Sequence, residues 1–462
     1  MIVSLLRPIS RALAALALGV LALSSTRAAT THLTTRMEQV VQKQVGADRF
    51  TGAVLVARNG EVIFDRAYGL ANREWEIPNT PETHFRIGSV TKQFTAVATL
   101  LLAERGKLKL TDPVSAHWTG APETWSKVTL HHLLTQTSGI PNVTRDPEFI
   151  RWKFLPTTVR EMVGRFRDQP LEFAPGERHA YSNSNYLVLG LVIEEVSGRT
   201  FGEFLRENIL DPLGLNRTGL DSNLELLPRR ASGYWVRGER IGNAPYSDMS
   251  VPHAAGAMYS TTHDLWRWAE AVLGPGGGLL SAESRTKLLT PARDNYACGL
   301  RVADFQGRKV VEHGGNIAGF SSHLRHYPDQ GLTLVVLSNL STGRPVPEDI
   351  LRELATLVLD GDGGRKPGAQ PVRVSAAALE AYCGVYDVGR GTRVTFKLVN
   401  GDLAAQPEGA PEAKRVTPLS ESTFLLSSGD TEIEFVREAS GKVTHLVMRR
   451  DGRMRTAPRV SD

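Results

Sequence analysis

Two residues with complementary chemistry, Ser89 and Lys92, lie three positions apart in the stretch RIGSVTKQF at 86–94. On a helix this spacing puts both side chains on one face. A serine hydroxyl is a weak nucleophile until a neighbouring base accepts its proton. A lysine amine can be that base once desolvation has lowered its pKa. The spacing therefore predicts a helix that carries a nucleophilic serine beside its own base.

The residues after Lys92 indicate that this helix is buried. Apolar side chains recur at helical spacing, and others fill the remaining sides: Phe94, Ala96, Val97, Ala98, Leu100, Leu101 and Leu102. A helix that is apolar nearly all round belongs in a core, so its first turn is expected to be largely dry. Gly106 predicts where the helix ends.

Ser-x-x-Lys alone is a weak motif, because two residue types at fixed spacing recur by chance. Ser284 and Lys287 have the same spacing in a polar stretch that predicts a solvated helix face. We expect no chemistry there, so the assignment of Ser89 depends on other segments.

The first of these segments contains Tyr181 and Asn183, which follow a Pro175-Gly176 turn and precede a predicted helix at 183–196. A tyrosine near two cations can have its pKa lowered enough to relay protons. An asparagine amide can hold both a lysine and a substrate carbonyl. The alternative is a core tyrosine with a satisfied hydroxyl and an asparagine that caps the helix.

The second segment is His313-Gly314-Gly315-Asn316, between two strand-like runs. Paired glycines permit close backbone approach, so backbone N–H groups here can form half of an oxyanion hole. The alternative is a glycine-rich β-turn. A third segment, Leu133 to Pro141, fits a tight turn, and we expect it to have a supporting role only.

Three of these motifs occur together in a fixed order: Ser89-Val90-Thr91-Lys92, Tyr181-Ser182-Asn183 and His313-Gly314-Gly315. This set resembles the motifs of the serine β-lactamase and penicillin-binding protein superfamily. The Tyr-x-Asn form is similar to the branch of class C β-lactamases, D,D-peptidases and family VIII esterases. The resemblance spans about residues 36 to 360.

The resemblance implies a role for each residue. Ser89 would form an acyl-enzyme, Lys92 would assist its deprotonation, and Tyr181 would be the general base or its relay. The backbone N–H groups of Ser89 and Asn316 would form the oxyanion hole. The residues implied to bind substrate are Asn183, His313, Gly314, Gly315 and Asn316.

The third motif departs from the pattern of class C β-lactamases, which have Lys-Thr-Gly there. A histidine is mostly neutral above its reference pKa of about 6.5. His313 therefore lacks the permanent cation that helps bind a substrate carboxylate. This departure favours esterase or peptidase chemistry over efficient β-lactam hydrolysis.

The order of predicted elements indicates an α+β fold. Strands flank an Asn59-Gly60 hairpin turn near the start, and further strands lie at 298–303, 308–312, 320–327 and 332–338, with helices between. We expect an antiparallel sheet flanked by helices, with an inserted all-helical subdomain, over residues 29–360. A glycine-rich linker at 361–374 precedes a small all-β, barrel-like or sandwich domain at 375–462. This last domain loosely resembles the lipocalin-like appendage of related serine peptidases.

The composition indicates where the protein is located and argues against one class of partner. A basic n-region and a short apolar run predict a signal peptide at 1–28 and a periplasmic or secreted protein, with an uncleaved membrane anchor as the alternative. Removal of Arg7, Arg11 and Arg27 lowers the formal charge from +5 to +2, which argues against nucleic-acid binding. We expect no stable membrane span in the mature chain.

The cysteines and histidines give no sign of a cofactor. Cys298 and Cys383 lie far apart, and we expect two free, buried thiols, with a disulfide as the alternative. The histidines show no metal-ligand spacing, so we expect neither a metal nor another cofactor. The residues at 375–462 are candidates for homo-oligomerisation or for capping the active site, or they have no direct role.

The leading hypothesis is an exported serine hydrolase that acts through a Ser89 acyl-enzyme on ester or peptide-like amide substrates. A β-lactamase or a D,D-carboxypeptidase is the alternative within this class. Outside it, the chain would be a binding protein for penicillin or cell-wall peptides that does not turn over.

Overall fold

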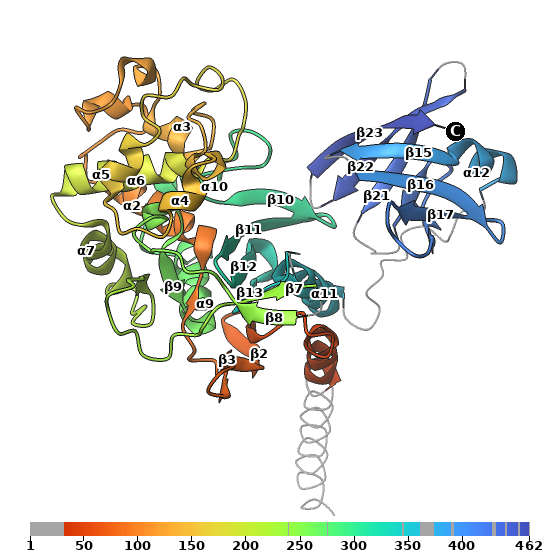
Figure 1. Ribbon diagram of the computed structural model, residues 1–462, viewed down its shortest axis with the longest axis horizontal. Helices are drawn as coiled ribbons and strands as arrows, with labels where there is room; N and C mark the ends of the chain where they lie inside the picture. The colour runs from red at the N-terminus through yellow and green to blue at the C-terminus, as the bar shows by residue number, and fades with distance from the viewer. Residues whose placement is uncertain are drawn as a thin grey trace, which may run out of the picture. The chain divides into compact units, whose positions relative to one another are not determined.

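The computed structural model describes residues 32–238, 240–274, 276–343, 346–360, 374–389, 392–426, 431–438, 441–450 and 453–461. They form two compact units (Figure 1). The first lies within Met1–Val302 and Val310–Asp362, and the second within Ala303–Lys309 and Gly363–Asp462. The predicted signal peptide, and the predicted linker except its last residue, fall outside the described residues.

A six-stranded sheet in the order β10-β11-β12-β13-β1-β2 organises the first unit. Its early and late strands pair antiparallel, with Val54 opposite Val336. The turn between the first two strands has positive φ at Asn59 and Gly60, as the Asn-Gly pair predicts. The predicted α+β fold is therefore confirmed. The strands are β1 (Gly52–Arg58), β2 (Glu61–Tyr68), β10 (Arg301–Phe305), β11 (Arg308–Ile317), β12 (Phe320–Tyr327) and β13 (Leu332–Ser338).

Most of the helices lie in the segment between the two halves of this sheet, and a further helix spans 32–45. The insert also contains short strands. Three of them form a small sheet of order β5-β9-β6, and two others join β14, which follows β13, in a sheet of order β14-β7-β8. The helices are α2 (Thr91–Glu104), α3 (Leu130–Leu134), α4 (Phe149–Trp152), α5 (Val159–Gly164), α6 (Asn183–Ser197), α7 (Phe201–Leu205), α8 (His253–Gly256), α9 (Thr262–Val272), α10 (Ala282–Leu289) and α11 (Val346–Asp360). The short strands are β3 (Leu70–Asn72), β4 (Ile77–Pro78), β5 (Phe85–Arg86), β6 (Gly219–Leu220), β7 (Tyr234–Arg237), β8 (Arg240–Asn243), β9 (Met258–Ser260) and β14 (Leu340–Ser341).

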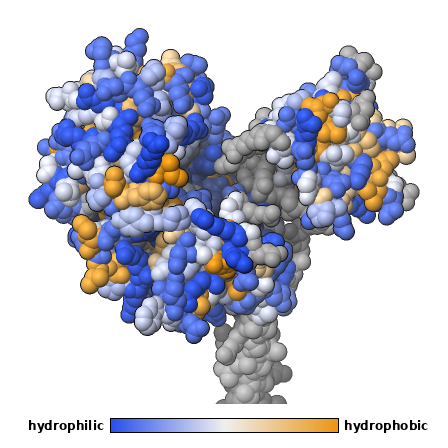
Figure 2. Space-filling model, in the orientation of Figure 1, coloured by the Kyte–Doolittle hydropathy of each residue, from blue (hydrophilic) through white to orange (hydrophobic). Residues whose placement is uncertain are grey.

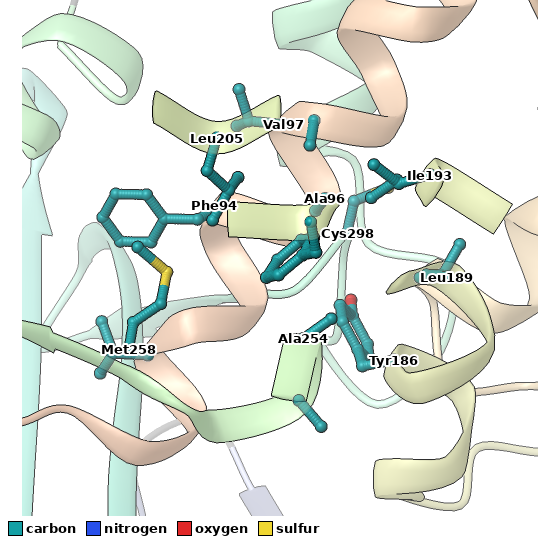
Figure 3. Packing of buried hydrophobic residues seen from close by; sticks show 14 of the residues in the cluster. Phe94, Ala96, Val97, Tyr186, Leu189, Ile193, Leu205, Ala254, Met258 and Cys298 are labelled. Carbon is teal, nitrogen blue, oxygen red and sulfur yellow. The ribbon is translucent and has the colours of Figure 1, made fainter. Parts of the chain in front are cut away.

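Helix α2 is buried on every side from Thr91 to Leu102, as its composition predicts. Phe94 stacks on Trp268 of α9 with ring centroids 3.9 Å apart. Figure 3 shows α2 side chains packed among residues of α6 and α8, including Tyr186 and Ala254. This packing excludes water from the beginning of α2, directly after the turn that carries Ser89.

The second unit is a nine-stranded sheet in the order β18-β17-β16-β15-β23-β22-β21-β20-β19. Its two edge strands are separated only by Val416, so the sheet nearly closes into a barrel. Aromatic rings fill the interior, where Tyr382 of α12 (Ala376–Tyr382) stacks on Phe435 at 4.4 Å. The strands are β15 (Gly384–Gly389), β16 (Thr392–Val399), β17 (Asp402–Pro407), β18 (Lys414–Arg415), β19 (Thr417–Pro418), β20 (Thr423–Leu425), β21 (Glu432–Arg437), β22 (Val443–Arg450) and β23 (Arg453–Ser461).

Both cysteines are free thiols, which excludes the disulfide, but only Cys298 is fully buried, whereas Cys383 is half-buried. Within the described ranges, no helix is long and apolar enough to cross a membrane, and no group of three metal-ligating side chains is found. Figure 2 shows a largely hydrophilic surface with scattered hydrophobic areas.

Candidate active site

Ser89 lies on a 3-10 turn, Gly88–Val90, that runs directly into α2. It therefore precedes the α-helix, whereas the sequence predicts a place within its first turn. Gly88 has φ +50°, and a Cβ there would lie 2.9 Å from the amide nitrogen of Asn316. A side chain at position 88 is thus excluded by both conformation and space.

Lys92 has no solvent-exposed surface, and its Nζ contacts three oxygen atoms. The Oδ1 of Asn183 lies at 2.8 Å, the carbonyl oxygen of Ala255 at 2.7 Å, and the Oγ of Ser89 at 3.1 Å. Burial lowers the pKa of Lys92 well below its ordinary value of 10.5. The two carbonyl-type oxygens can only accept, so they take both N–H groups of a neutral amine. Its lone pair then faces the hydroxyl of Ser89.

Tyr181 supplies the second contact to the nucleophile, with its Oη 2.8 Å from Ser89 Oγ. Burial raises the pKa of Tyr181 above its ordinary value of 10.0. The expectation that cations lower this pKa is therefore wrong, because desolvation outweighs the hydrogen bond with Ser89, which lowers the pKa. The neutral phenol can donate to Ser89 while Ser89 donates to Lys92.

Asn183 is the first residue of α6, and Ser182 occupies the N-cap position. The alternative of an N-capping asparagine is thus wrong, since the Asn183 side chain accepts from Lys92. Its own placement depends on Gln136, whose Oε1 accepts from the Ser182 amide at 3.0 Å and from Asn185 Nδ2 at 2.6 Å. The Leu133 to Pro141 segment therefore supports the loop that carries Tyr181.

Helix α8 supplies the backbone acceptor for Lys92, a feature that the sequence did not reveal. A Cβ on Gly190 of α6 would lie 2.6 Å from Ala254 Cβ. The two helices therefore pack closely here because position 190 has no side chain. His253, at φ +34°, also reaches Glu194 of α6 across 3.3 Å. The small-residue run at 254–257 is the signal for this close approach.

The third motif lies within β11, where Gly314 pairs with His323 of β12. It does not form the glycine-rich turn that was the alternative. A Cβ on Gly315 would lie 2.0 Å from the carbonyl oxygen of Ile87 and 2.9 Å from the Ser89 amide nitrogen. The backbone of β11 thus lies directly against the Ser89 turn.

Comparison with known proteins agrees with this geometry. The Beta-lactamase family model matches residues 37–357, which include all three motifs. The chain belongs to the beta-lactamase family. Penicillin-binding protein 4* of Bacillus subtilis strain 168 is 28% identical over 432 residues, 87% of this chain and 93% of that protein. PbpX of the same strain, named for penicillin binding, is 31% identical over 64% of this chain and 71% of its own length.

A solved structure extends the likeness beyond the family match. An octameric penicillin-binding protein homologue from Pyrococcus abyssi has a TM-score of 0.64 at 27% identity, and the alignment covers 92% of this chain and 99% of that one.

In this member of the beta-lactamase family, His313 is a buried neutral side chain. Its Nδ1 lies 2.6 Å from the carbonyl oxygen of Gly314 and its Nε2 lies 3.2 Å from Tyr296 Oη. Burial, with the charge of a protonated Lys92 as a smaller cause, lowers the pKa of His313 to about 3. Both ring nitrogens are occupied, so His313 offers no cation to a substrate. Tyr296, which holds it, was not singled out from the sequence.

The second Ser-x-x-Lys pair has none of this environment. It lies on α10, where Lys287 is half-exposed and pairs with Glu283 at 2.7 Å. The expectation of a solvated face holds for Lys287 but is wrong for Ser284, which is buried. The pair is still an internal control, because it has the same spacing and its lysine is paired with Glu283.

Proposed function

We propose that this chain is a serine hydrolase that forms an acyl-enzyme on Ser89. One observation carries the proposal: Ser89 Oγ lies between the buried amine of Lys92 at 3.1 Å and the phenol of Tyr181 at 2.8 Å. Lys92 accepts the hydroxyl proton as Oγ attacks the substrate carbonyl. The developing oxyanion accepts from the amides of Ser89 and Asn316.

A proton then leaves with the product. As the tetrahedral intermediate collapses, the leaving group takes the proton of Tyr181 Oη. The ammonium of Lys92 then returns a proton to the phenolate oxygen of Tyr181. Water attacks the acyl-enzyme in the second half-reaction, and its proton follows the reverse path to Ser89. No metal or redox group takes part in this scheme.

The substrate in this proposal is an ester or a peptide-like amide. Relatives named for penicillin binding support a peptide-like or strained cyclic amide. The neutral state of His313 argues against a substrate that needs a cation at the third motif. A β-lactamase or D,D-carboxypeptidase activity is therefore the secondary proposal.

Turnover of p-nitrophenyl esters tests the proposal. We expect Ser89→Ala to lower kcat/KM by at least about 10³-fold, whereas the matched Ser284→Ala variant on α10 keeps the wild-type rate. Equal rates in wild type and Ser89→Ala would refute a Ser89 acyl-enzyme.

A binding protein without turnover is the candidate from another class, favoured by the names of the relatives. Intact mass spectrometry after incubation with benzylpenicillin separates the two. A stable adduct that is absent in Ser89→Ala, with no turnover of nitrocefin, a D-Ala-D-Ala peptide or esters, would support the binding protein.

Two further proposals concern the rest of the chain. Residues 1–28 are removed on export to the periplasm or medium, and N-terminal sequencing of the secreted protein tests this.

Residues 375–462 form a separate domain that promotes homo-oligomerisation, supported by the octameric Pyrococcus homologue. Light scattering of the full chain and of a chain ending at 360 tests this, and identical monomer masses would refute it.

A further inference from the structure

A cavity of about 690 Å³ lies in the first unit, outside the contacts described for Ser89. Its walls come from the loop around β7 and β8 (Figure 1) and from the turn between β11 and β12. Arg86, Arg230, Asn223, Tyr246 and Phe320 are among the residues that line it. Of the described residues that form its wall, the charged ones are two arginines and none is acidic.

The two arginines are held by one buried carboxylate behind the wall. Arg86 Nε donates to Asp221 Oδ2 at 2.6 Å, and Arg230 Nη1 donates to Asp221 Oδ1 at 2.8 Å. The side chain of Asp221 is 1% exposed. The two guanidinium groups share the one carboxylate of Asp221, and these contacts use only Nε of Arg86 and Nη1 of Arg230.

A second carboxylate, Asp248, lies near Arg86, whose charge helps to lower the Asp248 pKa, but Asp248 does not line the cavity. Asp248 accepts from Tyr246 Oη at 3.0 Å and from the Ser250 hydroxyl at 2.6 Å. The Arg86 guanidinium also lies over the Phe320 ring, 5.8 Å from its centroid. The cavity thus combines fixed guanidinium donors with an aromatic wall.

The chain connects this cavity to the candidate active site on two sides. Arg86 precedes Ser89 by three residues, so their Cα atoms lie within about 11 Å of each other. Ala318 and Phe320, which line the cavity, follow Asn316 on the other side of the proposed oxyanion hole. The walls of the cavity thus begin within a few residues of the proposed nucleophile and of the proposed oxyanion hole.

We propose that this cavity binds a carboxylate on the acyl part of the substrate, held by the guanidinium groups of Arg86 and Arg230. The inference rests on the proposed serine hydrolase function. Arginine presents paired N–H groups that match a carboxylate, and such charge-assisted bonds are the stronger kind. The Phe320 ring packs against the methylene groups that link the carboxylate to the reacting carbonyl.

Two esters of equal length test the inference. The 4-nitrophenyl monoester of glutaric acid ends in a carboxylate, and the 4-nitrophenyl ester of glutaramic acid ends in a neutral amide. We expect wild type to prefer the carboxylate ester by about tenfold or more in kcat/KM. Equal values for the two esters would overturn the inference.

Variants then assign the preference to the cavity. Arg230→Gln should bring the ratio of the two esters close to one, while Arg230→Lys keeps part of it. Arg229→Gln is the matched control, because Arg229 is adjacent in sequence but pairs with Glu82 at 3.1 Å and does not line the cavity. Ser247→Asp adds a negative charge to the wall without removing a partner of Asp221, and it should lower the ratio as well. A ratio unchanged in both Arg230→Gln and Ser247→Asp would overturn the inference.

A binding measurement separates failure of the inference from failure of the proposed function. Calorimetry on Ser89→Ala compares glutaranilic acid with its neutral amide, glutaranilamide. The cavity is supported if Ser89→Ala binds the acid more tightly than the amide and the double variant Ser89→Ala with Arg230→Gln does not. This holds even where no ester is hydrolysed. Where neither ester is hydrolysed, equal binding of acid and amide overturns the inference.

Discussion

The Nζ of Lys92 donates to Oδ1 of Asn183 across 2.8 Å and so joins the first turns of α2 and α6. This bond and the one to the Ala255 carbonyl direct the remaining position of the amine toward Ser89. The orientation of the proposed base is therefore set by two helices that pack on α2. Changes at those acceptors should alter proton transfer more than substrate binding.

Asn183→Asp tests this arrangement with little change in shape. A carboxylate 2.8 Å from the amine favours the protonated form of Lys92 and raises its pKa. Because the neutral amine is the active form, the acid limb of the kcat/KM profile should move to higher pH. The rate at pH 7 should fall by about tenfold or more. An acid limb that stays at its wild-type pH would contradict this role for Asn183.

Tyr181→Phe removes the phenol that contacts Ser89 and leaves the ring in place. We expect kcat to fall by about 10²- to 10⁴-fold, the usual contribution of a positioned proton donor. Because burial raises the Tyr181 pKa above 10, the wild-type rate should not decline from its ionisation below pH 10. An alkaline limb near pH 8 that disappears in Tyr181→Phe would show that the phenolate is the active form.

The side chains of the site were predictable because their types and order are informative. Ser89, Lys92, Tyr181 and Asn183 meet through hydrogen bonds that the structure contains, as the three motifs predict. The ionisation states of these side chains were harder to predict from the sequence, because a pKa depends on burial. The lowered pKa of Lys92 follows from an all-apolar helix, but the raised pKa of Tyr181 depends on neighbours distant in sequence.

Other features have no local sequence signal. The acceptor at Ala255 is a backbone carbonyl, which every residue type provides, so only the packing of α8 on α6 reveals it. The two glycines at 314 and 315 predict a turn as readily as a strand, and pairing with β12 decides between them. Strand β23 (Arg453–Ser461) was likewise not predicted, because its sequence lacks an apolar run and pairing with β22 defines it.

Gly315→Ala tests the close approach of β11 to the nucleophile. The new Cβ would lie 2.0 Å from the Ile87 carbonyl oxygen, so the Ser89 turn or the strand must shift. We expect a loss of about 1–3 kcal/mol of stability, the usual cost of overpacking, and a large fall in kcat on neutral esters.

The neighbouring Gly314→Ala is the matched control, because its nearest neighbour is the His323 ring at 3.1 Å. Thermal unfolding and ester kinetics of both variants check the prediction. Equal effects at the two positions would show that the oxyanion geometry does not depend on backbone contact at Gly315.

Glu312→Gln tests the buried charge cluster that supports β11. The Glu312 carboxylate accepts from Arg325 Nε at 2.7 Å and lies 3.0 Å from His323 Nε2. Burial alone would raise the Glu312 pKa, but the charges of Arg325 and His323 outweigh it and lower the pKa below 4.5. The folded state therefore binds this proton less tightly than the unfolded state. The resulting stabilisation is present above pH 4.5 and is lost as the pH falls through the lowered folded-state value.

Substitution by glutamine removes the carboxylate charge that pairs with the buried Arg325. At pH 7 we expect Glu312→Gln to lower the free energy of unfolding by about 3–5 kcal/mol, measured by urea denaturation of the full chain. The difference from wild type should shrink as the pH falls below 4.5, because the unfolded wild-type chain then binds a proton at Glu312 that the folded state does not bind. Glu283→Gln on exposed α10 should leave stability unchanged. A difference between wild type and Glu312→Gln that is the same at pH 7 and pH 3 would mean that shape, not charge, accounts for the effect.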